Sequence, residues 1–315
     1  MSDYQRLIVH LGYHKTASTW FQKRYYPYVE NATYIPREYI LEALCKPYRF
    51  DYDPAPLLQE IHKCHSDTVI LSHEELSGNI HSGGLNGHLS RFVADEIVRL
   101  FPDCHVVIFI RHQVSMIASC YRQYVKEGGT YSVDHYLHHA MDDFRYRHPL
   151  FIWEHLQYDK LIRYYIQLLG RSRVHVFLFE AFKHDIPQFL DIFEAALGLS
   201  ASREQIDFSE SNSSNPDYTL GLQRWLNQFS FQNVGYKRVI MPLNTSFMHL
   251  NDRVKRHRLL RRITKRLPIR SKKSAHHLLG ENNVQHIQQY YAPSNQVLVD
   301  ELGLDLQKYD YPLLG

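Results

Sequence analysis

The sequence predicts an α/β fold in which a central, mostly parallel sheet lies between two layers of helices. Short apolar runs recur along the chain, and stretches with helical periodicity separate them. The apolar runs are continuous rather than alternating, which is typical of strands covered by helices on both faces of a parallel sheet. A chain of 315 residues is long enough to bury the core of such a fold in one large domain. We therefore expect a single domain over residues 1–315.

The individual elements follow from local patterns. Four strands are expected, over residues 7–11, 68–72, 105–110 and 174–179. A helix is expected over residues 154–169, because leucine and tyrosine residues recur there on one stripe and Gly170 follows as a stop. Another is expected over residues 187–197, with Asp185 as its N-cap and Gly198 after its end. This alternation favours right-handed crossovers between parallel strands.

The composition narrows the class of protein but not its activity. Hydrophobic residues make up 44% and charged residues 22% of the chain, which is ordinary for a soluble globular protein. The net charge of +3 with neutral histidines does not indicate a nucleic-acid partner, and none is expected. No apolar run is long enough to span a bilayer, the first residues lack a signal-peptide pattern, and the four cysteines form no C-x-x-C pair. We therefore expect a cytoplasmic protein with reduced cysteines.

The first expected strand leads directly into a loop suited to bind phosphate. Gly12 ends the apolar run, Lys15 follows, and the hydroxyl residues Thr16, Ser18 and Thr19 stand at the start of an apparent helix. Backbone N–H groups and the positive end of the helix dipole attract an anion there, and the lysine adds a mobile charge. The pattern predicts that the first part of the chain binds a phosphorylated nucleotide. For this loop alone, the alternative is a solvated turn before a helix.

A second anion site is predicted after the third expected strand. Arg111 stands at the carboxyl tip of the run 105–110, where open α/β sheets bind their ligands. Ser119 lies about two turns into the following helix, so both side chains can face the carboxyl edge of the sheet. Arginine binds a phosphate with two hydrogen bonds, and serine adds a third. Two such sites suggest a ligand with phosphates at both ends, although Arg111 could instead pair with a carboxylate and Ser119 could face solvent or the core.

These two motifs resemble those of the sulfotransferases that use 3′-phosphoadenosine 5′-phosphosulfate (PAPS). That family has a loop of the form K-[ST]-G-[ST]-T-x-[LWF], and residues 15–20 match its first six positions except at Ala17. It also has an arginine at a strand end with a serine eight positions later, as Arg111 and Ser119 stand here. Its bacterial carbohydrate-type branch is further resembled by three downstream segments, residues 212–216, 290–298 and 309–312. The resemblance implies a P-loop-NTPase-like fold and in-line transfer of the sulfuryl group from PAPS to a hydroxyl of a carbohydrate or glycolipid, releasing adenosine 3′,5′-bisphosphate (PAP).

The resemblance also implies a role for each site residue. Lys15 contacts the bridging oxygen that leaves on PAP, and Arg111 with Ser119 holds the 3′-phosphate. Ala17 replaces the family's glycine, which would matter if the position needs a positive φ. No metal is expected, because a sulfuryl group carries less negative charge than a phosphoryl group and a lysine with backbone donors suffices. The loop that holds the 5′-phosphosulfate comprises Lys15, Thr16, Ala17, Ser18, Thr19 and Trp20, although the Trp20 side chain is itself expected to anchor the first helix in the core.

Three candidates for the base that takes the acceptor's proton follow the second expected strand. Family members place a histidine or a glutamate after this strand, and the chain offers His73, Glu74 and Glu75. We favour Glu74, with His73 next, because a neighbouring Lys15 would keep the carboxylate ionised while burial would raise its pKa. The alternative is a polar loop in which one of these residues caps the following turn.

Two further segments carry unusual composition. The run 253–273 is strongly basic with apolar residues at helical spacing, so it could close over PAPS, hold an anionic acceptor glycan or lie on an anionic membrane. Its alternative is a solvated helix. Residues 128–150 are expected to form a surface insertion near the mouth of the site. His135, His139 and Asp143 have the spacing of one helix face there, but in a chain with 21 histidines this spacing carries little weight for a metal site.

Two other functions fit parts of the sequence. Lys15-Thr16 resembles the end of the phosphate loop of a P-loop kinase or NTPase, but His14 replaces the glycine before the lysine and Val9 stands where the first glycine belongs. The strands also end in serine and arginine rather than in an acidic partner for Mg²⁺. A non-enzymatic polyanion-binding protein would use residues 253–273, and its affinity would fall steeply with salt. That function does not explain two anion motifs at strand ends.

Overall fold

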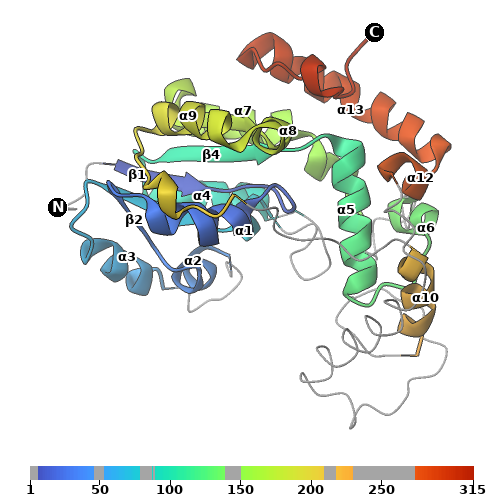
Figure 1. The fold of residues 1–315 in the computed structure, drawn as a ribbon, viewed down its shortest axis with the longest axis horizontal. Coiled ribbons are helices and arrows are strands. Elements are labelled where there is room, and N and C mark those ends of the chain that lie inside the picture. The colour runs from blue at the N-terminus through green and yellow to red at the C-terminus, as the bar shows by residue number, and fades with distance from the viewer. Residues whose placement is uncertain are drawn as a thin grey trace.

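The computed structural model describes residues 6–45, 53–78, 87, 89–138, 150–208, 218–229 and 274–315. Within these residues the strands form one parallel sheet in the order β2-β3-β1-β4-β5 (Figure 1). The strands predicted from the sequence are confirmed to within a residue, whereas β2, with only three residues, is too short to show a periodic pattern. Their bounds are β1 (Arg6–His10), β2 (Ala32–Tyr34), β3 (Thr68–Ser72), β4 (His105–Ile110) and β5 (Val174–Leu178).

The central strand of the sheet is β1. It pairs with β3 on one side and with β4 on the other, so that His10 at its end is in register with Ser72 of β3 and Val107 of β4. Because the strands are parallel, the segments that follow β1, β3 and β4 leave the sheet at the same carboxyl edge. The three motifs expected to form the site begin in these segments.

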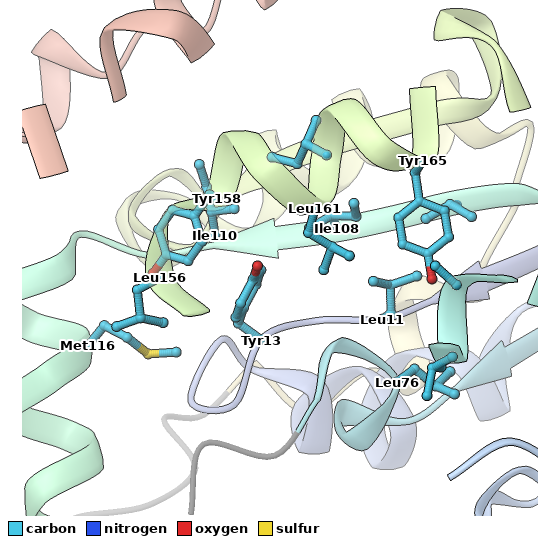
Figure 2. Packing of buried hydrophobic residues seen from close by; sticks show 14 of the residues in the cluster. Leu11, Tyr13, Leu76, Ile108, Ile110, Met116, Leu156, Tyr158, Leu161 and Tyr165 are labelled. Atoms are coloured by element: carbon cyan, nitrogen blue, oxygen red, sulfur yellow. The ribbon is translucent and has the colours of Figure 1, made fainter. Parts of the chain in front are cut away.

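Apolar side chains fill both faces of the sheet. Leu7 and Val9 belong to one buried cluster and Ile8 to the other. Successive side chains of a strand point to opposite faces of the sheet. Because helices cover both faces here, successive positions are all apolar, which explains the continuously apolar runs in the sequence. Figure 2 shows the first cluster, in which Tyr13 from the loop after β1 meets Tyr158 with ring centroids 4.8 Å apart. The predicted α/β fold with helices on both faces of a parallel sheet is confirmed.

The helices agree in most places with the sequence patterns. Asp185 caps its helix as predicted, accepting from the backbone N–H of Gln188 at 3.0 Å, and Gly198 ends it with a φ of 63°. The helix expected from residue 154 begins at Tyr158, because a separate 3-10 turn covers Trp153–Leu156. The helices of the described residues are α1 (Ser18–Trp20), α2 (Arg37–Leu44), α3 (Ala55–His62), α4 (Ser90–Leu100), α5 (Gln113–Lys126), α6 (Val133–His138), α7 (Tyr158–Leu169), α8 (Phe179–His184), α9 (Ile186–Leu197), α10 (Tyr218–Asn227), α12 (Ala275–Leu279) and α13 (Glu281–Leu302).

Helix α5 carries the chain away from the sheet. It starts just after β4, and α10, α12 and α13 pack along it, although they come from much later in the chain (Figure 1). Within the predicted insertion 128–150, α6 places Tyr136 and Leu137 in the core. That part of the segment therefore contributes to the packing around α5.

Several predicted features fall outside the described residues. They are the basic run 253–273, the segment 212–216, and residues 139–149 with His139 and Asp143. In the part of the chain that the structure describes, no group of three or more His, Cys, Asp or Glu side chains is arranged to hold a metal ion. No helix in that part is long and apolar enough to cross a membrane. The four cysteines are unpaired thiols.

Candidate active site

The loop after β1 makes a tight turn before α1. The buried hydroxyl of Thr16 donates to the Tyr13 carbonyl, and the Ala17 carbonyl accepts from the backbone N–H of Trp20 at 2.8 Å. Lys15 and Ala17 have φ values of 68° and 70°, in the left-handed region. This conformation costs a residue with a Cβ about 1–2 kcal/mol, whereas glycine adopts it readily. Ala17 is therefore held under backbone strain in a conformation that glycine adopts more readily.

Helix α1 is short and is anchored by aromatic side chains. It continues as a wider π-helical turn over Phe21–Tyr25. Trp20 is buried and packs edge-on against Phe182 with ring centroids 5.0 Å apart, so its side chain anchors the loop in the core as expected. Of the remaining hydroxyl residues in the loop, Ser18 is buried and Thr19 is exposed.

The Lys15 side chain reaches α5. Its Nζ donates to Oε1 of Gln123 at 2.8 Å, and Nε2 of Gln123 donates in turn to Glu127 at 2.6 Å. Burial lowers the pKa of Lys15, and the nearby Lys126 and Arg111 cations lower it further. Lys15 is thus a half-buried cation held by a neutral amide rather than by a carboxylate.

Arg111 is held close to the same loop. Its Nη1 donates to the Lys15 carbonyl at 2.9 Å, and its guanidinium carbon lies 4.6 Å from the centre of the Phe179 ring. Its own carbonyl accepts from the Tyr158 hydroxyl at 2.7 Å. The buried Nε has no hydrogen-bond partner among the described residues, and burial lowers the pKa of the guanidinium. Ser119 is half-buried further along α5, the helix that begins after Arg111.

The end of the chain packs against this second anchor. The Glu180 carboxylate accepts from the backbone N–H of His112 at 3.0 Å and from the Tyr311 hydroxyl at 2.7 Å. His112 donates from Nε2 to the Asp310 carbonyl at 2.8 Å. Sequence reasoning missed Glu180 and connected the Tyr311 segment only by resemblance, because these contacts join residues more than sixty positions apart.

His73 caps the turn that follows β3. Its backbone N–H donates to the His10 carbonyl at 3.2 Å, and its Nδ1 accepts from the backbone N–H of Glu75 at 3.1 Å. Burial lowers the pKa of His73 to about 4, so the imidazole is neutral near pH 7. The capping role that the sequence offered as an alternative is therefore realised at His73.

Glu74 is the first residue of that turn, and its carboxylate has two neighbours that the sequence did not suggest. Gln22 donates from Nε2 to Oε2 at 3.2 Å, and Nη2 of Arg37 lies 3.6 Å from Oε1. Burial raises the pKa of Glu74, but His73, its own backbone N–H, Arg37 and His14 together hold it below its usual value. The ionised state that we expected from Lys15 thus comes from other groups, because Lys15 is bonded to Gln123.

A buried hydrogen-bond chain ties Glu74 to the centre of the sheet. Gln22 Nε2, which donates to Glu74, also donates to the Ser72 carbonyl at 3.2 Å. The Ser72 hydroxyl in turn forms a hydrogen bond with Nδ1 of His10 at 2.9 Å. His10 is fully buried, and burial lowers its pKa to about 3. The chain links the ends of β1 and β3 through neutral groups.

The site residues therefore form two adjoining groups. The first group contains Lys15, Arg111 and Gln123 of α5, and the second contains His73 and Glu74. The groups meet where the Ser77 hydroxyl donates to the Gly12 carbonyl at 3.4 Å. A helical pattern could have found Gln123, which lies four positions after Ser119 on the same helix face. No local pattern could have found Gln22 or Arg37, because they reach Glu74 only through tertiary packing.

Comparison with known proteins points to one fold. No protein-family model and no curated protein matches the chain. Among solved structures, it is similar to a sulfotransferase from Alicyclobacillus acidocaldarius, with 18% identity, a TM-score of 0.50, and coverage of 70% of this chain and 91% of that chain. A mouse sulfotransferase, SULT7A1, complexed with PAP matches at 10% identity and a TM-score of 0.44, covering 97% of this chain and 88% of that chain. The described residues thus adopt a sulfotransferase-like α/β fold.

Proposed function

We propose that this protein is a PAPS-dependent sulfotransferase that transfers the sulfuryl group to a hydroxyl of a carbohydrate or glycolipid acceptor and releases PAP. One observation carries the proposal. Lys15 and Arg111, which the family resemblance assigns to opposite ends of the nucleotide, meet at the carboxyl edge of one sheet with a 2.9 Å hydrogen bond between them. The buried Nε of Arg111, which bonds to nothing in the part of the chain that the structure describes, is a donor available to an anion.

The reaction requires positioning and charge stabilisation more than covalent help from the protein. PAPS supplies a sulfuryl group on a good leaving group: a bond forms from the acceptor oxygen to sulfur, and the bond from sulfur to the bridging oxygen breaks. Lys15 leaves Gln123 and donates from Nζ to that bridging oxygen, where negative charge develops. Arg111 and Ser119 hold the 3′-phosphate, and the loop around Thr16 holds the 5′ end.

Glu74 takes the proton of the acceptor hydroxyl. Its carboxylate is ionised near neutral pH, because the surrounding groups hold its pKa below the usual value. His73 is less suited to the role, because its Nδ1 lone pair already accepts from the Glu75 backbone N–H. Gln22 holds the carboxylate at Oε2, and the acceptor hydroxyl approaches Oε1, which lies 3.6 Å from Nη2 of Arg37.

The acceptor class and the location have separate support. The resemblance of residues 290–298 and 309–312 to the bacterial carbohydrate-type branch supports a carbohydrate or glycolipid. The basic run 253–273 would contact an anionic acceptor or the surface of a membrane from the cytoplasmic side. Deletion of that run, followed by sedimentation with anionic vesicles, distinguishes a membrane contact from an acceptor contact.

Calorimetric titration with PAP, 5′-AMP and ATP·Mg²⁺ tests the proposal. Binding that requires the 3′-phosphate supports the two-anchor site and justifies an acceptor screen with PAPS. Binding of ATP·Mg²⁺ but not of PAP would assign the site to a kinase or NTPase. Binding of none of the three would contradict the proposal and favour a polyanion-binding protein.

A further inference from the structure

Arg37, the first residue of α2, lies beside the proposed base and has no role in the mechanism above. Its Nη2 is 3.6 Å from Oε1 of Glu74 and 3.2 Å from Nε2 of His73. The Arg37 side chain is 51% exposed, whereas that of Glu74 is 18% exposed. Arg37 therefore presents a positive charge to solvent at the rim of the pair that handles the acceptor's proton.

The contact between Arg37 and His73 is a poor one. His73 accepts at Nδ1 from the backbone N–H of Glu75 at 3.1 Å, so the neutral ring carries its proton on Nε2. A guanidinium is a donor only, which means that two donors face each other at 3.2 Å.

The contact between Arg37 and Glu74 is also incomplete. At 3.6 Å it is longer than a hydrogen bond, and it uses a single nitrogen of the planar fork. Two parallel hydrogen bonds to an oxyanion are the arrangement that a guanidinium satisfies best. An anionic group brought by the acceptor would supply them.

We infer that Arg37 is a specificity-determining residue that binds an anionic group of the acceptor, a carboxylate or a sulfate ester, next to the hydroxyl that Glu74 deprotonates. The inference rests on the proposed function, and it narrows the acceptor to acidic glycans. A neutral acceptor leaves the guanidinium with its two poor contacts, whereas an acidic acceptor accepts two parallel hydrogen bonds from it.

The change in local charge supports the same role. Arg37 is among the groups that hold the pKa of Glu74 down. An acceptor anion bound to Arg37 offsets that positive charge, so the carboxylate becomes more basic when an acidic acceptor is in place. The pairing thus couples recognition of the acceptor to the strength of the base.

The test compares matched glycans on the full-length protein saturated with PAP. The probes are a tetrasaccharide of alternating glucuronic acid and N-acetylglucosamine, its carboxyl-reduced form, and the reduced form bearing a sulfate ester. We expect the protein to bind the two anionic probes about tenfold more tightly than the neutral one. The relative affinity of the two anionic probes identifies which anion Arg37 prefers.

Three variants assign that preference to Arg37. Arg37→Ala removes the preference, Arg37→Lys retains part of it, and Arg99→Ala, which removes an equally exposed arginine paired with Glu96 on α4, leaves it intact. Equal affinity for charged and neutral probes, binding of none of them, or a preference that survives in Arg37→Ala overturns the inference. PAP affinity is measured for every variant, because its loss in the unmodified protein would instead contradict the proposed function.

Discussion

The two groups of site residues hold their cations in different ways. In the group that we assign to the nucleotide, Lys15 and Arg111 have good partners, Gln123 and the Lys15 carbonyl, at 2.8 and 2.9 Å. In the group that we assign to the acceptor, Arg37 faces a carboxylate 3.6 Å away and an opposing donor among the residues that the structure describes. The first group sits on loops that leave adjacent central strands, whereas Arg37 comes from a helix that follows the short edge strand β2.

This difference in hydrogen bonding indicates how each group can respond to a ligand. The nucleotide group is built before the ligand arrives, so substitutions there act on binding and on the chemical step. Arg37 gains its first good partner from the ligand, so substitutions there act on the choice of acceptor. We expect the two largest effects at Lys15 and Glu74, and smaller ones at the other positions.

Lys15→Ala should reduce sulfuryl transfer by at least about 10²–10³-fold, because it removes the donor aimed at the developing charge. Its effect on PAP affinity should be smaller than that of Arg111→Ala, measured by calorimetry. Gln123→Ala is the matched control, because it removes only the partner that Lys15 must leave. Full activity in Lys15→Ala would mean that another group donates to the leaving oxygen in the transition state, and it would contradict the role that we assign to Lys15.

Glu74→Gln should lower turnover by about 10²–10⁴-fold, the usual range for a general base. PAP affinity should stay unchanged, because the side chain lies in the other group. Steady-state kinetics beside His73→Ala identify the base. A large loss confined to His73→Ala would show that the capping histidine is the base.

The pH dependence of turnover should change in Arg37→Ala. The base must be ionised, so turnover falls as the pH drops through the pKa of Glu74, which His73, Arg37 and His14 hold below its usual value. Removal of the Arg37 cation raises that pKa, and the acid limb should therefore move to higher pH. If the acid limb of the kcat profile, measured with a neutral acceptor, does not move in Arg37→Ala, then Arg37 does not influence the pKa of the base.

Tyr311→Phe should weaken both the fold and PAP binding modestly. It removes the 2.7 Å hydrogen bond to Glu180, which also accepts from His112 beside the nucleotide anchor. The loss of one such bond costs about 1–2 kcal/mol. Urea unfolding and PAP titration measure the two effects, and Tyr309→Phe serves as the control from the same segment. Equal behaviour of the two variants would mean that the end of the chain does not support the anchor.

Ala17→Gly should stabilise the protein slightly. Relief of about 1–2 kcal/mol of left-handed strain outweighs the extra flexibility of glycine, about 0.5–1 kcal/mol, so the free energy of unfolding should rise by up to about 1 kcal/mol. Gly198→Ala is the reverse control, because its φ is 63° and a Cβ would lie 2.8 Å from Arg6 Nη1. A lower free energy of unfolding for Ala17→Gly in urea would show that the positive φ of Ala17 does not carry the expected strain.

The nucleotide group was far easier to predict than the acceptor group. Lys15 lies in the loop after β1 and Arg111 directly follows β4, and a parallel sheet brings such positions to one edge whatever the rest of the chain does. Glu74 was predicted for the same reason, but its neighbours were not. Gln22 contacts it across fifty-two positions and Arg37 across thirty-seven, and no periodic pattern connects residues at those distances.

The amino-acid sequence accounts for every strand of the sheet except β2 and for the places where charged residues leave it, because continuous apolar runs and strand ends are local properties. Only the tertiary structure decided the partners of those charges. Lys15 bonds to an amide on α5, and His73 caps a turn. Arg37, not Lys15, lies beside Glu74. The physical reason is that hydrogen bonding and burial depend on which distant segments pack together, and packing of the whole chain sets that choice.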